Sequence, residues 1–198
     1  MLFRSNMKGD IQGMDAKGDE KRARIIAAAK DEFIKKGYEE ANLRDIGAAA
    51  GSTLGGIYRF FNGKEVLFSA LSEPAMQLFE TYFTETMCAE LPAFPAKIQE
   101  SVTKFVADAY ADIDSLRLIA CTAGAPCEAV LRQKSATLGA QIAAHSALSA
   151  EAAALLFQTT FSALLEIARK NLSQEKGIAA AQQLGGFLSA GWQQATAQ

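Results

Sequence analysis

Two short helix signatures joined by a glycine turn constrain the fold of this 198-residue chain more than any other feature. Asn42 and Thr53 are favourable N-caps for two successive helices, and Gly51 stands between them. Glycine readily adopts the left-handed backbone conformation that such a turn requires. Residues 47–50 are all glycine or alanine, which lets two helices cross at close range. The segment from Asn42 to Lys64 therefore predicts a helix-turn-helix.

A longer amphipathic helix precedes this pair. Ile26, Ala29 and Phe33 recur at helical spacing, while lysines and arginines occupy the other faces. Gly37 follows two lysines, as is typical of a glycine at a helix C-terminus. Three apolar residues of the helix-turn-helix are expected to pack on this stripe: Ile46, Ile57 and Phe61.

The rest of the chain also has helical periodicity. Lys64 is expected to open a long helix reaching about Glu90, with a kink or break at Pro74. No stretch shows sustained alternation with a period of two, so the prediction is an all-α fold of about nine helices. We expect a disordered arm over 1–17, a helix-turn-helix domain over 18–64 and a second helical domain over 65–198. Helices within the second domain are predicted near 96–113, 115–122, 126–146, 150–172 and 174–194.

Composition excludes several classes of protein. Hydrophobic residues make up 49% and charged residues 21% of the chain, which is typical of a soluble globular protein. No apolar run is long enough to cross a bilayer and the N-terminus lacks a secretory pattern, so we expect a cytoplasmic protein without a membrane partner. The three cysteines and one histidine lack metal-ligand spacing, and no cofactor motif is present. Without a nucleotide-binding loop or a nucleophile elbow, the chain is not expected to be an enzyme.

The charges are distributed unevenly. Residues 1–64 carry 12 lysines and arginines against 9 acids, whereas the remaining residues carry 8 against 13. The basic excess therefore coincides with the helix-turn-helix, as expected of a DNA-binding domain. Tyr58, Arg59 and Lys64 add side chains suited to phosphate and base-edge contacts.

Within about residues 20–68 the sequence resembles the N-terminal domain of the TetR family of transcriptional regulators. The resemblance implies a homodimeric repressor that binds a pseudo-palindromic operator in double-stranded DNA and is released by a small-molecule effector. Activation instead of repression stays open. The matching residues are Arg24-Ile-Ile-Ala-Ala-Ala29, Phe33, Gly37-Tyr38, Arg44-Asp-Ile46, Ala50-Gly51, Gly55, Ile57-Tyr58, Phe61 and Lys64-Glu65.

The resemblance implies DNA contacts for eight residues of the helix-turn-helix and its flanks. Leu54 stands where the family often has lysine or another polar residue, Gly56 where threonine is common, and Gly47 where alanine is usual. The operator sequence is therefore not predicted, although Leu54 suits contact with a thymine methyl group. The implied DNA contacts are Arg44, Thr53, Leu54, Gly55, Gly56, Tyr58, Arg59 and Lys64.

The resemblance also implies that residues 65–198 bind the effector and form the dimer. A largely apolar effector is the preferred expectation, since many aromatic residues fall in this region. The residues expected to line its pocket are Phe79, Phe83, Phe105, Tyr110, Phe157 and Phe161. The residues expected in the dimer interface, on two amphipathic C-terminal stripes, are Phe157, Leu164, Leu184, Leu188 and Trp192.

Two alternative functions remain open. One is a helical interaction module that has lost DNA binding. Leu54 and the small basic excess favour this alternative, because both weaken the argument for DNA binding. The other is a repressor that senses oxidants or electrophiles through a thiol. Cys121 and Cys127 flank a helix break, and a helix N-terminus there would lower the pKa of Cys127. Buried, inert thiols are the competing interpretation.

Overall fold

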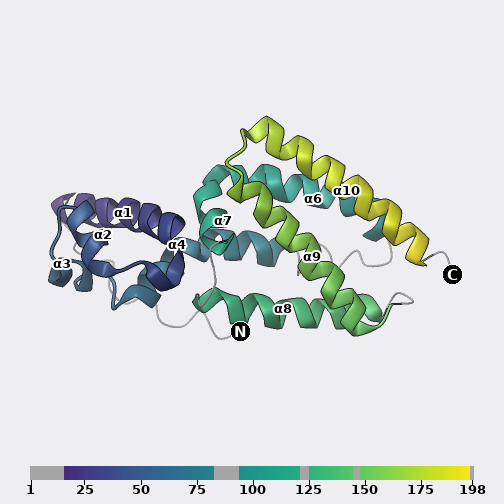
Figure 1. Ribbon diagram of the computed structural model, residues 1–198, viewed down its shortest axis with the longest axis horizontal. Coiled ribbons are helices and arrows are strands. Elements are labelled where there is room, and N and C mark those ends of the chain that lie inside the picture. The colour runs from purple at the N-terminus through teal and green to yellow at the C-terminus, as the bar shows by residue number, and fades with distance from the viewer. Residues whose placement is uncertain (1–15, 83–93, 121–124, 145–147, 197–198) are drawn as a thin grey trace.

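The computed structural model describes residues 16–82, 94–120, 125–144 and 148–196. Within these ranges the regular elements are all helices, which confirms the all-α prediction. Four N-terminal helices lie at one end of the elongated molecule, and the later helices form the other end (Figure 1). The N-terminal helices are α1 (Ala16–Glu40), α2 (Leu43–Ala49), α3 (Leu54–Tyr58) and α4 (Lys64–Phe79).

The second part of the molecule is a set of packed helices. Helix α10 lies along α6, while α9 crosses in front of α8 and leads to α10 (Figure 1). The 3-10 turn η3 (Tyr110–Asp112) separates α6 from α7, a few residues before the break that the sequence predicted between 113 and 115. The helices of this part are α6 (Phe94–Ala109), α7 (Ile113–Ala120), α8 (Pro126–Ala143), α9 (Ala150–Arg169) and α10 (Gln174–Thr196).

Two glycines allow the closest helix crossings in this part. A Cβ on Gly139 of α8 would lie 2.8 Å from the backbone nitrogen of Ala154 in α9. A Cβ on Gly185 of α10 would lie 2.7 Å from the Cα of Gln99 in α6. Since backbone atoms cannot move aside as a side chain can, both contacts require glycine in this arrangement.

The structure has two hydrophobic cores. One joins α1, α2, α3 and the first half of α4, and it also takes in Leu118 of α7 and Cys127 of α8. The other fills the space among α4, α6, α7, α8, α9 and α10. Because α4 contributes Leu67 and Phe68 to the first core and Phe79 to the second, it connects the two parts of the molecule.

Helix α4 continues through Pro74, where the sequence predicted a kink or a break. Proline removes one backbone donor from the helix. Leu71, Ala75 and Phe79 are nevertheless buried on one side of α4, and their packing holds the helix across the missing hydrogen bond. Helix α3 ends at Tyr58 and is therefore shorter than the helix to Phe61 that was expected.

Helix α9 is long and apolar enough to cross a membrane by length and composition alone, contrary to the expectation from sequence. That evidence is weak, because core helices of soluble proteins pass the same test. Ala153, Phe157 and Leu164 of α9 are buried against the neighbouring helices, so one face of α9 belongs to the protein core.

Candidate DNA-binding surface

Asn42 begins α2 as the sequence predicted. Its Oδ1 accepts hydrogen bonds from the backbone N–H groups of Arg44 at 3.0 Å and Asp45 at 2.9 Å. Lys36 of α1 forms a 2.8 Å ion pair with Asp45, and this bond, together with one from the Asn42 amide, lowers the pKa of the Asp45 carboxyl. The start of α2 is thereby held against the end of α1, and the Arg44 side chain is left exposed.

The turn between α2 and α3 depends on two glycines. Gly51 has a φ of 61°, the left-handed conformation predicted for it. The backbone N–H of Ser52 donates to the carbonyl of Gly47 at 2.8 Å, and a Cβ on Gly47 would lie 3.0 Å from the Ser52 carbonyl oxygen. The small residue at position 47 therefore lets the turn fold back closely on α2.

Helix α3 has one face in the core and one face in solvent. The Oγ1 atom of Thr53 accepts a hydrogen bond from the backbone N–H of Gly56 at 3.1 Å, which confirms Thr53 as the N-cap. Ile57 is fully buried, whereas Tyr58 is 51% exposed and Arg59 follows it at the surface. The short α3 helix thus has the amphipathic form of a recognition helix.

An open groove of about 590 Å³ lies between the start of α2 and the exposed side of α3. It brings together three of the predicted DNA contacts, namely Arg44, Leu54 and Tyr58, with a guanidinium, an apolar side chain and a phenol. This is the mixture of groups that reads base edges and phosphates. The other lining residues are Asn42, Leu43 and Asp45.

The two glycines of α3 have different surroundings. A Cβ on Gly55 would meet nothing within 4 Å, so this position is open to an approaching surface. A Cβ on Gly56 would lie 2.4 Å from the Ser52 hydroxyl and 2.9 Å from the Lys21 ammonium of α1. Gly55 therefore leaves space for close approach to DNA. Gly56 instead leaves space for the side chains of Ser52 and Lys21.

Lys64 has a structural role that the sequence did not indicate. Its ammonium donates to the backbone carbonyls of Tyr38, Glu39 and Ala41 at 2.7–3.1 Å and lies 4.6 Å from the centre of the Tyr38 ring. All three ammonium protons are thus used at the end of α1. This corrects the expectation that the Lys64 side chain grips the DNA backbone.

We expect Lys64→Met to destabilise the N-terminal helices by about 1–3 kcal/mol, because it leaves partly buried carbonyls without donors. Urea unfolding of the purified protein measures this change. Lys35→Met is the matched control, since Lys35 lies exposed on α1, among the same N-terminal helices, with no ion pair among the described residues. Equal unfolding midpoints for the two variants would contradict the role assigned to Lys64.

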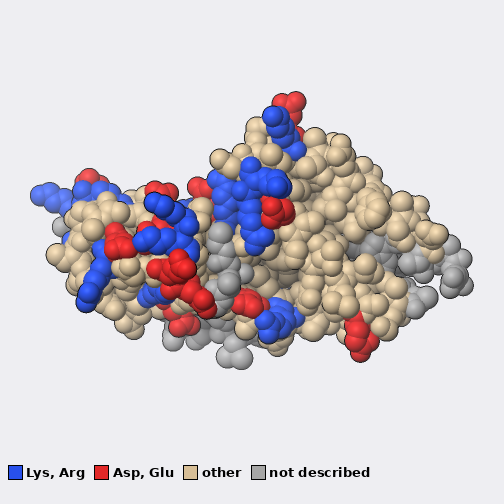
Figure 2. All heavy atoms as spheres, in the orientation of Figure 1, with Lys and Arg blue, Asp and Glu red and all other residues tan. Residues whose placement is uncertain are grey.

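Lys64 uses its ammonium on backbone carbonyls, whereas the side chains of Arg44 and Arg59 make no hydrogen bond or ion pair within the described part of the chain. The Arg59 guanidinium lies 5.9 Å from the centre of the Phe60 ring. Charged side chains gather over α1–α4 and near the junction of α7 with α9 (Figure 2). Both arginines therefore keep their hydrogen-bond donors available to an external anion.

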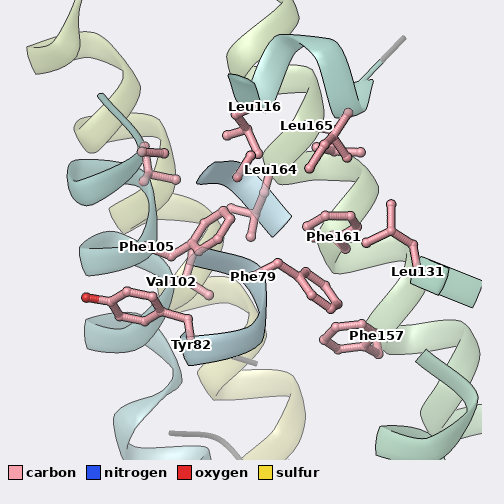
Figure 3. Close-up of a cluster of buried hydrophobic side chains, with 14 of the residues drawn as sticks. Phe79, Tyr82, Val102, Phe105, Leu116, Leu131, Phe157, Phe161, Leu164 and Leu165 are labelled. Atoms are coloured by element: carbon pink, nitrogen blue, oxygen red, sulfur yellow. The ribbon is translucent and has the colours of Figure 1, made fainter. Parts of the chain in front are cut away.

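Three of the aromatic residues predicted to bind the effector come together. The ring of Phe79 lies 4.8 Å from that of Phe161 and 6.1 Å from that of Phe157, centre to centre (Figure 3). Phe105 is fully buried and packs against Tyr82, at a ring distance of 6.0 Å. These rings fill the core between α4, α6 and α9.

Tyr110, a fifth predicted effector contact, makes a different set of contacts. The Tyr110 hydroxyl lies 3.2 Å from the carbonyl oxygens of Leu172 and Ser173, at the turn into α10. Tyr110 therefore fastens that turn to η3. Phe83 lies outside the described residues.

The expected dimer contacts need correction. Phe157 and Leu164 are 4% and 0% exposed and face the core of their own subunit. Leu184 and Leu188 are half-buried against the same core, and the Trp192 side chain lies outside the described residues. The large apolar side chains that α9 and α10 do expose are Leu155, Leu156 and Phe187.

The expected activation of Cys127 is wrong. Burial raises the pKa of this thiol to about 11, because the thiolate would lose its hydration. The nearby start of α8 does not offset that effect. Cys88, Cys121 and His145 lie outside the described residues.

These features define a class of protein: an all-α helix-turn-helix protein with a helical C-terminal domain. The family model for bacterial regulatory proteins of the tetR family matches residues 25–71. Over 63 residues the chain is 44% identical to the transcriptional regulator TtgR of Pseudomonas putida, and over 75 residues it is 36% identical to SrpR of the same species. In its N-terminal part the chain is therefore similar to the TetR family.

The sequence matches are confined to the N-terminal part. They cover 32% of this chain and 29% of TtgR, and 38% of this chain and 35% of SrpR. The fold, by contrast, matches over most of the length. The crystal structure of NalD, a secondary repressor of a multidrug efflux pump in Pseudomonas aeruginosa, matches with a TM-score of 0.60 at 20% identity and covers 88% of this chain and 97% of NalD. At that identity the likeness establishes the fold alone.

Proposed function

We propose that this chain is a homodimeric transcriptional repressor that binds double-stranded DNA through α2 and α3. The observation that carries the proposal is the exposed groove formed by Arg44, Leu54 and Tyr58 beside the open position of Gly55. The groove side of α3 faces solvent, and the buried Ile57 on its other side packs α3 against the core. The match of these same N-terminal residues to the TetR family supports the proposal. The role is regulatory and not enzymatic, and its location is the cytoplasm.

The second subunit is proposed to pack on α9 and α10. Leu155 is 63% exposed and Phe187 is 78% exposed, and exposed apolar side chains of this size are typical of interfaces. The surface over α9 and α10 also carries few charged side chains in the view of Figure 2. A twofold axis there would present two α3 helices to half-sites about 34–36 Å apart or somewhat more, which makes the operator pseudo-palindromic.

A hydrogen-bonded network is proposed to couple the two parts of the molecule. Lys30 of α1 pairs with Asp112 of η3 at 2.8 Å, and the Ser115 hydroxyl lies 2.6 Å from the same carboxylate. That hydroxyl also lies 2.9 Å from the carbonyl oxygen of Leu71 in α4. Because the network joins α1, α4 and α7, a shift of α7 would change the position of the DNA-binding helices.

The proposed effector is small and largely apolar, and it would act through the core around Phe79 and Phe161. Binding there would move α4 or α7 relative to α9, since these rings join α4 to α9. Arg117 of α7 donates to the carbonyl of Ala168 in α9 at 3.1 Å, so α7 is linked to the proposed dimer helix as well. An effector releases DNA only if it binds the DNA-free conformer more tightly.

Selection of duplexes from a random library tests the proposal. The wild-type protein is expected to enrich an inverted repeat, and Arg44→Ala/Arg59→Ala is expected to enrich none. The competing function is a helical interaction module that does not bind DNA. Leu54 favours this alternative, because it places an apolar side chain in the groove. Failure of the wild-type protein to retain any duplex at low salt would overturn the proposal and support the module.

A further inference from the structure

Lys21 of α1 stands beside the recognition helix although it lies more than 30 residues before it. Its ammonium and Cε atom are 2.9 Å and 3.3 Å from the position that a Cβ on Gly56 would occupy. The Ser52 hydroxyl borders the same space, at 2.4 Å from that position. A Cβ at position 56 would therefore displace the end of the Lys21 side chain from this space.

The Lys21 ammonium has no partner of opposite charge within the part of the chain that the structure describes. Lys30 and Lys36, on the same helix, pair with Asp112 and with Asp45. Lys21 is partly exposed and retains its hydrogen-bond donors for an external anion. An unpaired lysine beside the recognition helix can bind an anionic group of whatever molecule that helix contacts.

A recognition helix that enters a major groove about 12 Å wide brings its neighbours close to the phosphates along the groove walls. We propose that Lys21 binds a backbone phosphate of the duplex, and that Gly56 serves as a positioning residue by leaving space for the Lys21 ammonium. This inference rests on the proposed DNA-binding function and adds to it a contact from α1. A phosphate contact contributes affinity to every DNA sequence, so it does not select the operator.

The test measures the affinity for a fluorescent duplex of arbitrary sequence over a series of salt concentrations. Loss of one phosphate contact is expected to lower the slope of log affinity against log salt concentration by about 0.9 for each subunit on the duplex. Lys21→Ala should therefore reduce the slope by that amount and weaken binding by roughly fivefold to tenfold at low salt. Lys35→Ala is the matched control, because it removes the same charge from the same helix at a distance of about 21 Å along the axis.

A double-mutant cycle tests the role of Gly56. Gly56→Ala is expected to weaken duplex binding in the wild-type background by about twofold to threefold, and to have no further effect in Lys21→Ala. Thermal unfolding of each variant separates binding from folding, since alanine also raises the helix propensity of α3.

Three outcomes distinguish this inference from the function on which it rests. If the wild-type protein binds no duplex, both are overturned. If it binds and Lys21→Ala behaves as Lys35→Ala does, the DNA-binding function stands and the phosphate contact is overturned. A fall in thermal stability of Lys21→Ala with an unchanged salt slope would assign Lys21 a purely structural role and likewise overturn the contact.

Discussion

Arg44→Ala is expected to weaken binding to the selected inverted repeat by about 10-fold to 100-fold, the range for loss of a good arginine contact with DNA. The guanidinium lines the groove between α2 and α3 and forms no ion pair within the described residues. Only its backbone N–H takes part in the Asn42 cap, and alanine keeps that group. Fluorescence anisotropy with a labelled duplex measures the loss.

The control for Arg44→Ala is Arg132→Ala, which removes the same charge from the surface of α8. Arg132 pairs there with Glu128 at 2.7 Å and lies outside the DNA-binding helices. Both variants should unfold at the wild-type urea concentration, because both arginines are exposed. Equal affinities of the two variants for the duplex would exclude Arg44 from the interface.

Leu155→Glu/Phe187→Glu is expected to convert the protein into a monomer and to reduce its affinity for the inverted repeat more than 100-fold. Two charges would be buried at the proposed interface, each at a cost of several kcal/mol. A monomer would also lose the gain from binding two half-sites together. Both side chains are exposed in the single subunit, so its own fold should tolerate the change. Light scattering after size-exclusion chromatography gives the mass.

Val66→Glu is the control for this double variant. Val66 is also a large apolar residue with substantial exposure, 46%, but it lies on α4 among the N-terminal helices. It should leave the mass in solution unchanged. A dimer that persists in Leu155→Glu/Phe187→Glu would mean that subunits do not associate through this part of α9 and α10.

The N-terminal helices could be predicted from local sequence because their ends depend on single residues. Asn42 and Thr53 cap their helices by bonding to N–H groups two or three residues later, and Gly51 adopts its positive φ within the turn itself. Such contacts span only a few residues, so a short stretch of sequence contains all the groups involved. The path of α4 through Pro74 was not predictable in this way, since its support comes from other helices.

The contacts of individual side chains at the candidate sites required the tertiary structure. Periodicity identifies an apolar face but not which neighbour covers it, so Phe157 and Leu164 were assigned to a partner although their own subunit buries them. Burial likewise outweighed the effect of the helix start at Cys127, where the pKa rises.

Sequence alone determined the all-α fold and the helix-turn-helix, because periodicity and capping are properties of neighbouring residues. Only the tertiary structure decided that Lys64 binds the carbonyls at the end of α1 while Arg44 remains available. It also decided that Gly56 borders Lys21. These roles depend on distances between helices that are far apart in the chain, and the spacing of residues along a sequence does not contain those distances.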